Sequence, residues 1–183
     1  MADTLTIRKL MEELTSGRMR VPNFQRGFVW DPERVSYLMD SIYKGFPFGS
    51  VLLWRTKESL SFERDLGPFS LPNNDPSFPT DYILDGQQRI TSIFGVFQTE
   101  LKILNIPLWA NIYFDFEATE NAQDSMFVAL DEPTPDAARF FPIGCLFDPV
   151  EYRKQTTRFV GNDAMLEKID NIQDRFKEAM IPV

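Results

Sequence analysis

The sequence predicts an α+β domain in which a small mixed sheet is flanked by helices, followed by a helical C-terminal segment. Three observations support this prediction. Residues 31–45 carry the start and stop signals of a helix, residues 82–94 pass from an apolar strand into a helical pattern, and prolines and glycines separate further short apolar runs. The chain has 183 residues, 43% of them hydrophobic, which is enough for one core. We place the domain at residues 1–150 and the helical extension at 151–183.

The first third of the chain contains two predicted helices joined by an extended segment. Residues 6–17, "TIRKLMEELTSG", repeat apolar side chains at helical spacing and stop at Gly17. An extended segment follows and ends near Pro22. In the second helix Asp31 is the expected N-cap and Pro32 the first helical residue. Its apolar stripe and its glycine stop are Val35, Leu38, Met39, Ile42 and Gly45.

The middle of the chain alternates predicted strands with a proline-rich loop. Residues 50–54, "SVLLW", predict a buried strand of the continuous apolar kind, and residues 59–63, "SLSFE", a further strand. Residues 64–80 hold four prolines and predict an irregular loop. The run "DYILD", residues 81–85, predicts a strand, and "QQRITSIFGVFQTE", residues 87–100, a helix with Ile90, Ile93, Phe94 and Phe97 facing inward.

The last third begins with strands and ends with a polar helical tail. Residues 108–118 and 125–131 predict strands, and residues 139–148 an extended segment. A mainly helical tail is expected from about Pro149 to Glu178. The final residues, "IPV", have the pattern of a strand that begins, so we expect the chain to be a fragment of a longer protein.

The composition excludes several classes of chemistry. There is no histidine, which removes Ser-His-Asp and Cys-His catalysis, the usual zinc sites and histidine-metal nucleases from this chain. The single cysteine, Cys145, cannot form an intrachain disulfide, so a cytoplasmic location is expected. No apolar run approaches the roughly 20 residues of a membrane span, and the N-terminus lacks a secretory pattern. We therefore expect no membrane partner.

The charge is distributed unevenly along the chain. Residues 1–60 carry 9 Lys and Arg against 7 Asp and Glu, whereas residues 61–183 carry 10 against 20. With a net charge of -8, the chain is a poor candidate for nonspecific DNA binding over its whole surface. A local basic patch, or a site for a small phosphorylated molecule, remains open.

The strand-to-helix turn at "YILDGQQRITSIF" predicts an anion site. Unpaired N–H groups and the helix dipole favour a phosphate at such a turn, and Gly86 lets it approach the backbone. Arg89 can grip phosphate with two donors, while Gln87 and Gln88 can donate to it or orient a water. Asp85 can hold a metal or accept from a ribose or a water. The alternative is that Asp85 merely caps the helix and the glutamines are solvated.

A second stretch, "VPNFQRGFVW" at residues 21–30, contains another Gln-Arg pair, Gln25-Arg26. Its aromatic residues Phe24, Phe28 and Trp30 are interpreted as core rather than as a platform for stacking bases. A Gly-Ser pair, Gly49-Ser50, then precedes the predicted strand at residues 50–54.

These stretches together carry a family resemblance. The patterns "VP-x-FQR-x-FVW", "L-x-DSI-x-x-G-x-P-x-GS-x-LLW" and "Y-x-LDGQQR-I-T-S" are similar to the N-terminal domain of GmrSD-type modification-dependent restriction enzymes. The resemblance covers roughly residues 5–150 in the family's order. It implies a ParB/sulfiredoxin-like α+β core and a nucleoside triphosphate bound at the DGQQR motif. It also implies hydrolysis coupled to restriction of modified DNA, and a downstream nuclease domain that is absent from this chain.

The resemblance also implies roles for individual residues. Arg26 is expected on a phosphate beside Gln25, and Gly49 and Ser50 at the wall of the site. Asp85, Gln88 and Arg89 are the expected catalytic residues, with Asp85 positioning water or Mg²⁺. The full set expected to bind nucleotide or phosphate is Gln25, Arg26, Gly49, Ser50, Gly86, Gln87, Arg89 and Thr91.

Three functions follow as alternatives. The first is a regulatory domain that hydrolyses or senses a nucleoside triphosphate with Mg²⁺ and reaches DNA through the full-length protein. The second is a module that recognises modified DNA through shape and phosphate contacts, without hydrolysis. The third is a ParB-like nuclease, against which the missing histidine and the acidic balance count.

Overall fold

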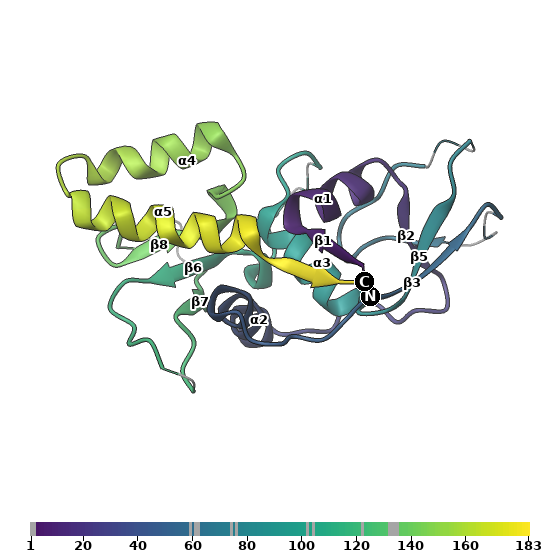
Figure 1. Cartoon of the computed structure of the whole chain (residues 1–183), viewed down its shortest axis with the longest axis horizontal. Helices are drawn as coiled ribbons and strands as arrows, with labels where there is room; N and C mark the ends of the chain where they lie inside the picture. Colours follow the sequence, from purple (N-terminus) through teal and green to yellow (C-terminus); the bar gives the residue numbers. More distant parts are fainter. Residues whose placement is uncertain are drawn as a thin grey trace.

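The computed structural model describes residues 3–58, 60, 63–73, 75, 77–101, 103, 105–121, 123–131 and 136–183. It is a mixed α+β structure, as the sequence predicts. The molecule is elongated (Figure 1): a four-stranded sheet lies at one end, a three-stranded sheet under two helices lies at the other, and three helices lie between them. The ParB-like character of the core is compatible with this arrangement and remains a prediction.

The four-stranded sheet has the order β3-β5-β2-β4 and is mixed. Its central strands β2 and β5 are parallel, and β3 and β4 are antiparallel edge strands. The strands are β2 (Met19–Pro22), β3 (Leu52–Thr56), β4 (Glu63–Arg64) and β5 (Thr80–Asp85). Because β5 pairs with a strand on each side, the helix that follows its C-terminal end begins at the middle of the sheet.

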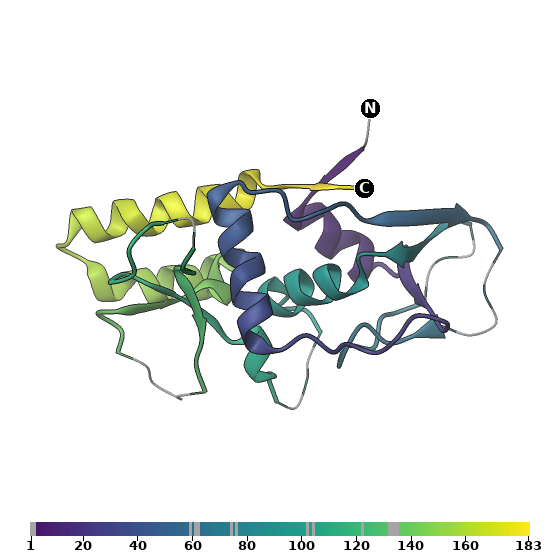
Figure 2. The same ribbon diagram turned by 90° about the horizontal axis from the view of Figure 1, so that it is seen from below.

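Three helices lie between the two sheets, and their ends follow the local signals. They are α1 (Ile7–Thr15), α2 (Pro32–Lys44) and α3 (Gln87–Phe97). Asp31 caps α2 by accepting a hydrogen bond from the Arg34 N–H at 2.8 Å, and Gly45 ends it in the left-handed conformation with φ +70°. Figure 2 shows α2 crossing the molecule beside α3.

The other end of the molecule is built from short strands and two helices. The three-stranded sheet, order β7-β6-β8, consists of β6 (Ile112–Asp115), β7 (Phe127–Ala129) and β8 (Phe140–Pro142). The polar tail forms α4 (Pro149–Thr156) and α5 (Asp163–Glu178). Single turns of 3₁₀ helix lie at η1 (Leu108–Ala110), η2 (Ile143–Cys145) and η3 (Thr157–Phe159).

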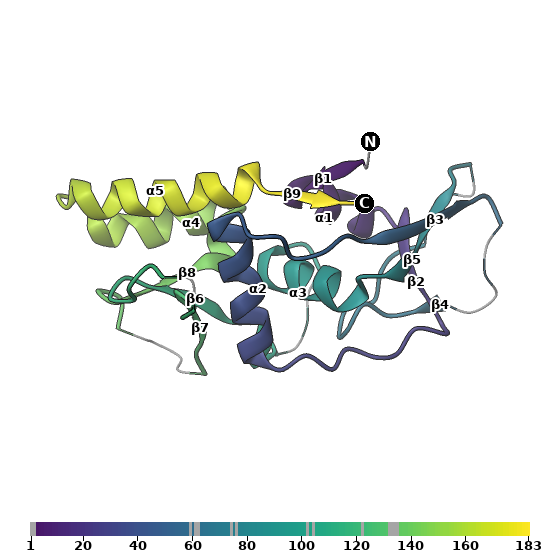
Figure 3. The same ribbon diagram turned by 60° about the horizontal axis from the view of Figure 1, so that its bottom comes forward.

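The two termini meet in a small ladder of their own. β1 (Thr4–Thr6) pairs antiparallel with β9 (Met180–Pro182), so the strand expected at "IPV" is confirmed. The Val51 N–H donates to the Pro182 carbonyl at 2.8 Å, which joins this ladder to the segment that leads into β3. In Figure 3 that segment runs from α2 to β3 alongside β9.

One hydrophobic cluster connects the parts, and several phenylalanine rings pack together in it. Phe97 on α3 and Phe127 on β7 both contact Phe176 on α5, with ring centroids 5.1 and 5.7 Å apart. Ile169 and Ile172 of α5 are also fully buried in this cluster. The predicted extension, residues 151–183, therefore shares its core with the preceding chain.

Two predictions about strands require correction. The run at residues 50–54 is not a buried strand: β3 is a sheet edge, Leu52 is 58% and Trp54 is 41% exposed, and only Val51 just before it is deeply buried. The extended segment at 139–148 forms a strand only at β8 and then turns into η2. Of the strand predicted at 59–63, residues 59, 61 and 62 lie outside the described residues, and Glu63 begins β4.

Within the described ranges, no helix combines the length and apolar composition that a membrane crossing requires.

Candidate functional site

The turn between β5 and α3 leaves a helix start without a side-chain cap. β5 ends at Asp85, Gly86 adopts φ +92°, and α3 begins at Gln87. No side chain accepts from the first turn of α3. In the described chain the other α-helices are capped by Thr6, Asp31, Asp148 and Asn162. The N-terminal N–H groups of α3 therefore keep their capacity to bind an anion.

Gly86 is required at this turn for two reasons. Its positive φ is costly for any residue with a Cβ atom. A Cβ atom there would also lie 3.0 Å from Val51 Cγ2 and 3.3 Å from Val51 Cα. The turn is thus packed closely against the segment that precedes β3. On this side of the turn, the group that approaches the Gly86 backbone closely is Val51 of the same chain and not a ligand.

Arg89 is held between the turn and the Gly49-Ser50 segment. Its Nη2 donates to the Ser50 carbonyl at 2.5 Å and lies 3.3 Å from Asp85 Oδ2. Gly49, with φ +88°, brings its backbone so close that a Cβ would lie 3.1 Å from Arg89 Nη1. Arg89 Nε is buried and has no partner among the described residues. A buried cationic N–H without an acceptor indicates capacity for a further anion.

The two glutamines of the motif are buried, so the alternative of solvated first-turn residues is wrong. Gln87 is 3% and Gln88 is 8% exposed. Gln88 Oε1 accepts from the Val29 N–H at 2.9 Å, and its Nε2 donates to the Gly27 carbonyl at 3.0 Å. Gln87 Nε2 is buried without a partner in the described chain. Gln88 is therefore engaged by protein, whereas Gln87 retains a free donor.

Asp85 does not cap α3, so the alternative in which Asp85 is only a helix cap is also wrong. Its side chain is 75% exposed, and its hydrogen bond goes to Arg89. An exposed carboxylate paired at this distance is easily displaced. Asp85 is thus available to a metal or a water at the mouth of the turn.

The structure brings the first Gln-Arg pair to the same place. Gln25 Nε2 donates to the Leu84 carbonyl at 2.8 Å, one residue before the motif. Arg26 is exposed and makes no hydrogen bond or ion pair with the described part of the chain. The loop at residues 23–30 is therefore attached to the β5–α3 turn through Gln25 on one side and Gln88 on the other.

Thr91 lies apart from this group. It is fully buried, and its Cγ2 would lie 2.8 Å from a Cβ at Gly67. Two residues along a helix correspond to about 200° of rotation, which turns Thr91 away from Arg89. Its Oγ1 is buried without a partner in the described chain, but the phosphate role predicted for Thr91 gains no support from this position.

The aromatic residues of the loop do not behave alike. Phe28 packs against Trp109 with ring centroids 4.3 Å apart, and Trp30 is partly buried against the core, as predicted. Phe24 is 70% exposed, so its assignment to the core is wrong. The difference arises because Phe24 lies at the tip of a turn, where the Gln25 N–H bonds back to the Pro22 carbonyl.

Sequence reasoning missed a cavity beside the turn. It has a volume of about 610 Å³ and lies between the end of α2, the segment at residues 45–49 and the junction of α5 with β9. Its walls are mainly aromatic and apolar, and Gly49 is the predicted site residue that lines it. Burial, and next the Glu120 carboxylate, raise the pKa of Tyr43 in its wall, so that hydroxyl stays protonated. The repeated aromatics of "GFPFG" are the only sequence signal for it.

A resident metal centre is not formed by the described side chains. They contain no cluster of three or more carboxylate, cysteine or histidine ligands. Magnesium bound with a triphosphate needs only one or two carboxylates, because phosphate oxygens and waters complete its shell. The exposed carboxylate of Asp85 satisfies that smaller requirement.

Comparison with known proteins gives two matches for this chain. Residues 7–179 match the family described as the GmrSD restriction endonuclease, N-terminal domain. The chain is also similar to an uncharacterized protein of Methanocaldococcus jannaschii, with 29% identity over 107 residues. That match covers 50% of this chain and 17% of the relative, so this chain spans a small part of the relative's length.

Proposed function

This chain belongs to the family of GmrSD restriction endonuclease N-terminal domains, and on this premise we propose that it binds a nucleoside triphosphate as the regulatory part of a restriction or phage-defence protein. The observation that carries the proposal is the uncapped start of α3 beside Arg89, whose Nε is buried without a partner in the described chain. A helix start and an arginine fork are complementary to phosphate oxygens.

The phosphates bind at the N–H groups of the first turn of α3 and at the Arg89 guanidinium. Ser50 and Gly49 hold this guanidinium from behind, so it is preorganised and loses little side-chain freedom on binding. The phosphate replaces Asp85 as the partner of Arg89, because Asp85 is exposed and its 3.3 Å contact is weak. Gln87 contributes its unpaired amide from the same turn.

Asp85, once displaced, is the carboxylate that holds Mg²⁺ or positions a water. The metal supplies neutralisation of the charge that develops on the phosphate oxygens. Hydrolysis by such a site depends on positioning and on charge stabilisation rather than on a strong base. The absence of histidine in this chain is therefore compatible with slow hydrolysis or with nucleotide sensing alone.

Thermal unfolding of the intact chain with each triphosphate, with and without Mg²⁺, tests the proposal. A ligand at about 100 times its dissociation constant stabilises the folded state by roughly 2.7 kcal/mol, which gives a clear shift in Tm. Arg89→Ala should abolish the shift. The matched control is Arg55→Ala, because Arg55 also pairs with an aspartate, Asp81, but is 73% exposed on β3. Shifts that survive in Arg89→Ala would contradict the proposal.

A second candidate function is recognition of DNA by the loop at residues 23–30. It is favoured by one observation: Phe24 and Arg26 are both exposed on this loop, although glutamines attach its backbone to the turn. An exposed aromatic beside an arginine suits a base and a neighbouring phosphate. Binding of a DNA duplex that weakens steeply with salt and is lost in Phe24→Ala and Arg26→Ala supports this candidate.

A further inference from the structure

The cavity beside the turn has the dimensions of a binding site for a small aromatic molecule. Its volume of about 610 Å³ falls within the range of ligand pockets, and such pockets combine apolar walls with a few polar groups. Its aromatic walls come from Tyr43, Phe46 and Phe48, and its C-terminal wall from Ala179, Met180 and Pro182. Phe46 is 44% exposed, so its ring presents a face to an incoming ligand.

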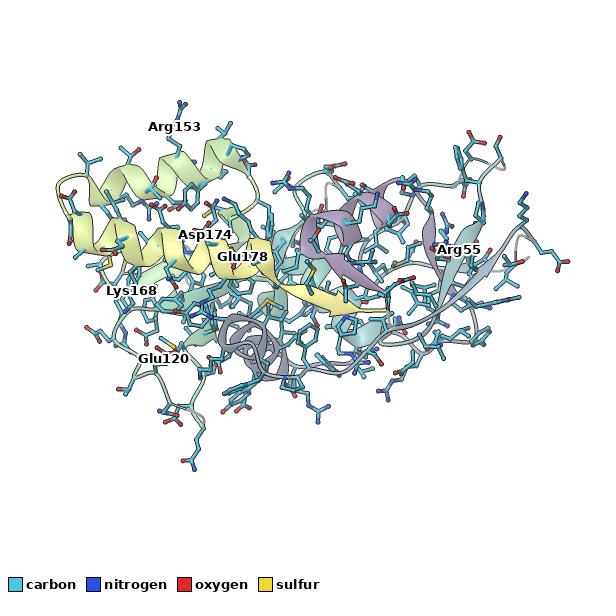
Figure 4. The ribbon with its side chains drawn as sticks, in the orientation of Figure 1. Arg55, Glu120, Arg153, Lys168, Asp174 and Glu178 are labelled. Carbon is cyan, nitrogen blue, oxygen red and sulfur yellow. The ribbon has the colours of Figure 1, made fainter. Side chains whose placement is uncertain are left out.

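Two charged residues supply polar groups at the edge of this cavity. Arg175 and Glu178, from the last turn of α5, both line it. Figure 4 shows Glu178 at the end of α5, next to β9. The site thus pairs an apolar interior with one acceptor and one donor group, a combination that suits the edge of a heterocyclic base.

Gly49 connects the cavity to the proposed phosphate site. The same residue lines the cavity and contacts the Arg89 guanidinium, with 3.1 Å between Nη1 and the position of a Cβ. Gly49 therefore places the wall of the cavity next to the guanidinium that is proposed to hold phosphate. A nucleotide that reaches around this residue would place its anionic end at one site and its aromatic end at the other.

We propose that this cavity receives the base and ribose of the nucleotide whose phosphates bind at the DGQQR turn. The inference rests on the proposed function, since it locates the base and ribose of the nucleotide whose phosphates the proposed function places at the turn. The base stacks on the exposed ring of Phe46, and the edge of the base meets Arg175 and Glu178. The cavity then accounts for binding of a nucleotide rather than of phosphate alone.

The test compares a nucleoside triphosphate with inorganic tripolyphosphate on the intact chain. Methyl-labelled methionine is followed by NMR, because Met180 lines the cavity while Met165 lies about 20 Å away along α5. The nucleotide should shift the Met180 signal, and tripolyphosphate should not. The Met165 signal should stay unchanged with both ligands.

Two variants measure the contribution of the cavity to affinity. Ala179→Phe fills it, and Phe46→Ala removes the stacking ring, while neither residue belongs to the turn. Loss of stacking between the base and one aromatic ring weakens binding roughly 5- to 150-fold. Both variants should show that loss with the nucleotide and none with tripolyphosphate, and unfolding curves confirm that each is folded.

The outcomes separate the two proposals. If the nucleotide binds no tighter than tripolyphosphate and leaves Met180 unmoved, the base does not occupy the cavity, but the phosphate site stands. If the nucleotide binds tighter but both folded variants retain its affinity, the base lies elsewhere and the inference is overturned. If neither ligand binds the unmodified chain, the inference and the proposed function are both wrong.

Discussion

The Gln88 side chain bonds the backbone of the loop at two points: Oε1 accepts from the Val29 N–H at 2.9 Å, and Nε2 donates to the Gly27 carbonyl at 3.0 Å. Both amide atoms of this side chain are thereby satisfied within the protein. Gln88 therefore positions the loop at residues 23–30, and the phosphate contact expected of it stays a prediction. Gln25 completes the attachment from the loop side through the Leu84 carbonyl.

Gln88→Ala should release the loop from α3. It removes two hydrogen bonds and leaves a partly buried N–H and a carbonyl unpaired, which costs roughly 1–3 kcal/mol. Urea unfolding gives the global loss, and hydrogen exchange at the Val29 amide should accelerate. Gln25→Ala is the matched control: it removes a single bond to Leu84 and should leave exchange at Val29 slow.

Gly86→Ala should destabilise the chain more than Gly45→Ala. Both glycines have positive φ, at +92° and +70°, so both substitutions cost roughly 1–2 kcal/mol of backbone strain. A Cβ at Gly45 meets nothing within 4 Å, whereas one at Gly86 lies 3.0 Å from Val51 Cγ2. The additional loss, measured by urea unfolding, reports the packing of the turn against Val51. Equal losses in the two variants would show that this packing is relaxed at no cost.

Predictions from the sequence hold where structure is determined by neighbours in the chain. The cap at Asp31, the stop at Gly45 and the strand-turn-helix at Gly86 all depend on side chains within four residues of the feature. The burial of residues 50–54 depends instead on which strands pair. An apolar run is expected inside a sheet, but here the sheet order leaves β3 at an edge, with Leu52 exposed.

The same distinction applies to the candidate site. That the two Gln-Arg pairs belong together follows from motifs, and the contact of Gln25 with Leu84 is consistent with it. The engagement of Gln88 by Gly27 and Val29 could not be read from the sequence, because it joins residues about sixty positions apart. The cavity likewise needs α2 and the end of α5 side by side, and no local periodicity encodes that contact.

Lys44→Met should strongly destabilise the fold. The Lys44 side chain is 4% exposed; Nζ lies 2.6 Å from Asp40 Oδ2 and also donates to the carbonyls of Asn121 and Asp124. Removing one partner of a buried pair leaves the other charge uncompensated, at a cost of roughly 3–5 kcal/mol. Lys9→Met is the control, because Lys9 also pairs with an acid four residues on, Glu13, but is 46% exposed. It should cost far less than Lys44→Met by urea unfolding, because solvent screens an exposed pair.

Cys145 should be unreactive in the folded protein. Burial raises the pKa of its thiol to about 12, and its Sγ lies 3.0 Å from the Pro142 carbonyl. At neutral pH almost no thiolate is present, and the thiolate is the nucleophile. A colorimetric thiol reagent should therefore label the chain only after urea is added. Since this is the sole cysteine, labelling measures opening around η2 directly, and rapid labelling without urea would contradict the burial.

Asp115 should make the free energy of unfolding decrease as the solution becomes acidic. Burial raises the pKa of Asp115. The hydrogen bonds that it accepts from Arg139 and from the Glu117 N–H, together with the positive charge of Arg139, outweigh burial and lower that pKa. A carboxyl whose folded pKa is depressed stabilises the fold above its unfolded pKa of about 3.9 and loses that contribution as the pH falls through the folded value. Arg139→Gln should therefore reduce stability at about pH 6 and converge toward the parent in stronger acid.

A double-mutant cycle separates this carboxylate from the other contacts of Arg139. The guanidinium also lies 4.9 Å from the centre of the Phe140 ring, and that contact does not titrate in acid. In an Asp115→Asn background, Arg139→Gln should lose the pH dependence that comes from Asp115, and the dependence that is left reports the second ion pair, between Arg139 Nη1 and Glu117 Oε2 at 3.1 Å. A coupling energy that is present at about pH 6 and absent in acid identifies the Asp115–Arg139 pair as its source. A coupling that persists after Asp115 is protonated would assign it to packing instead.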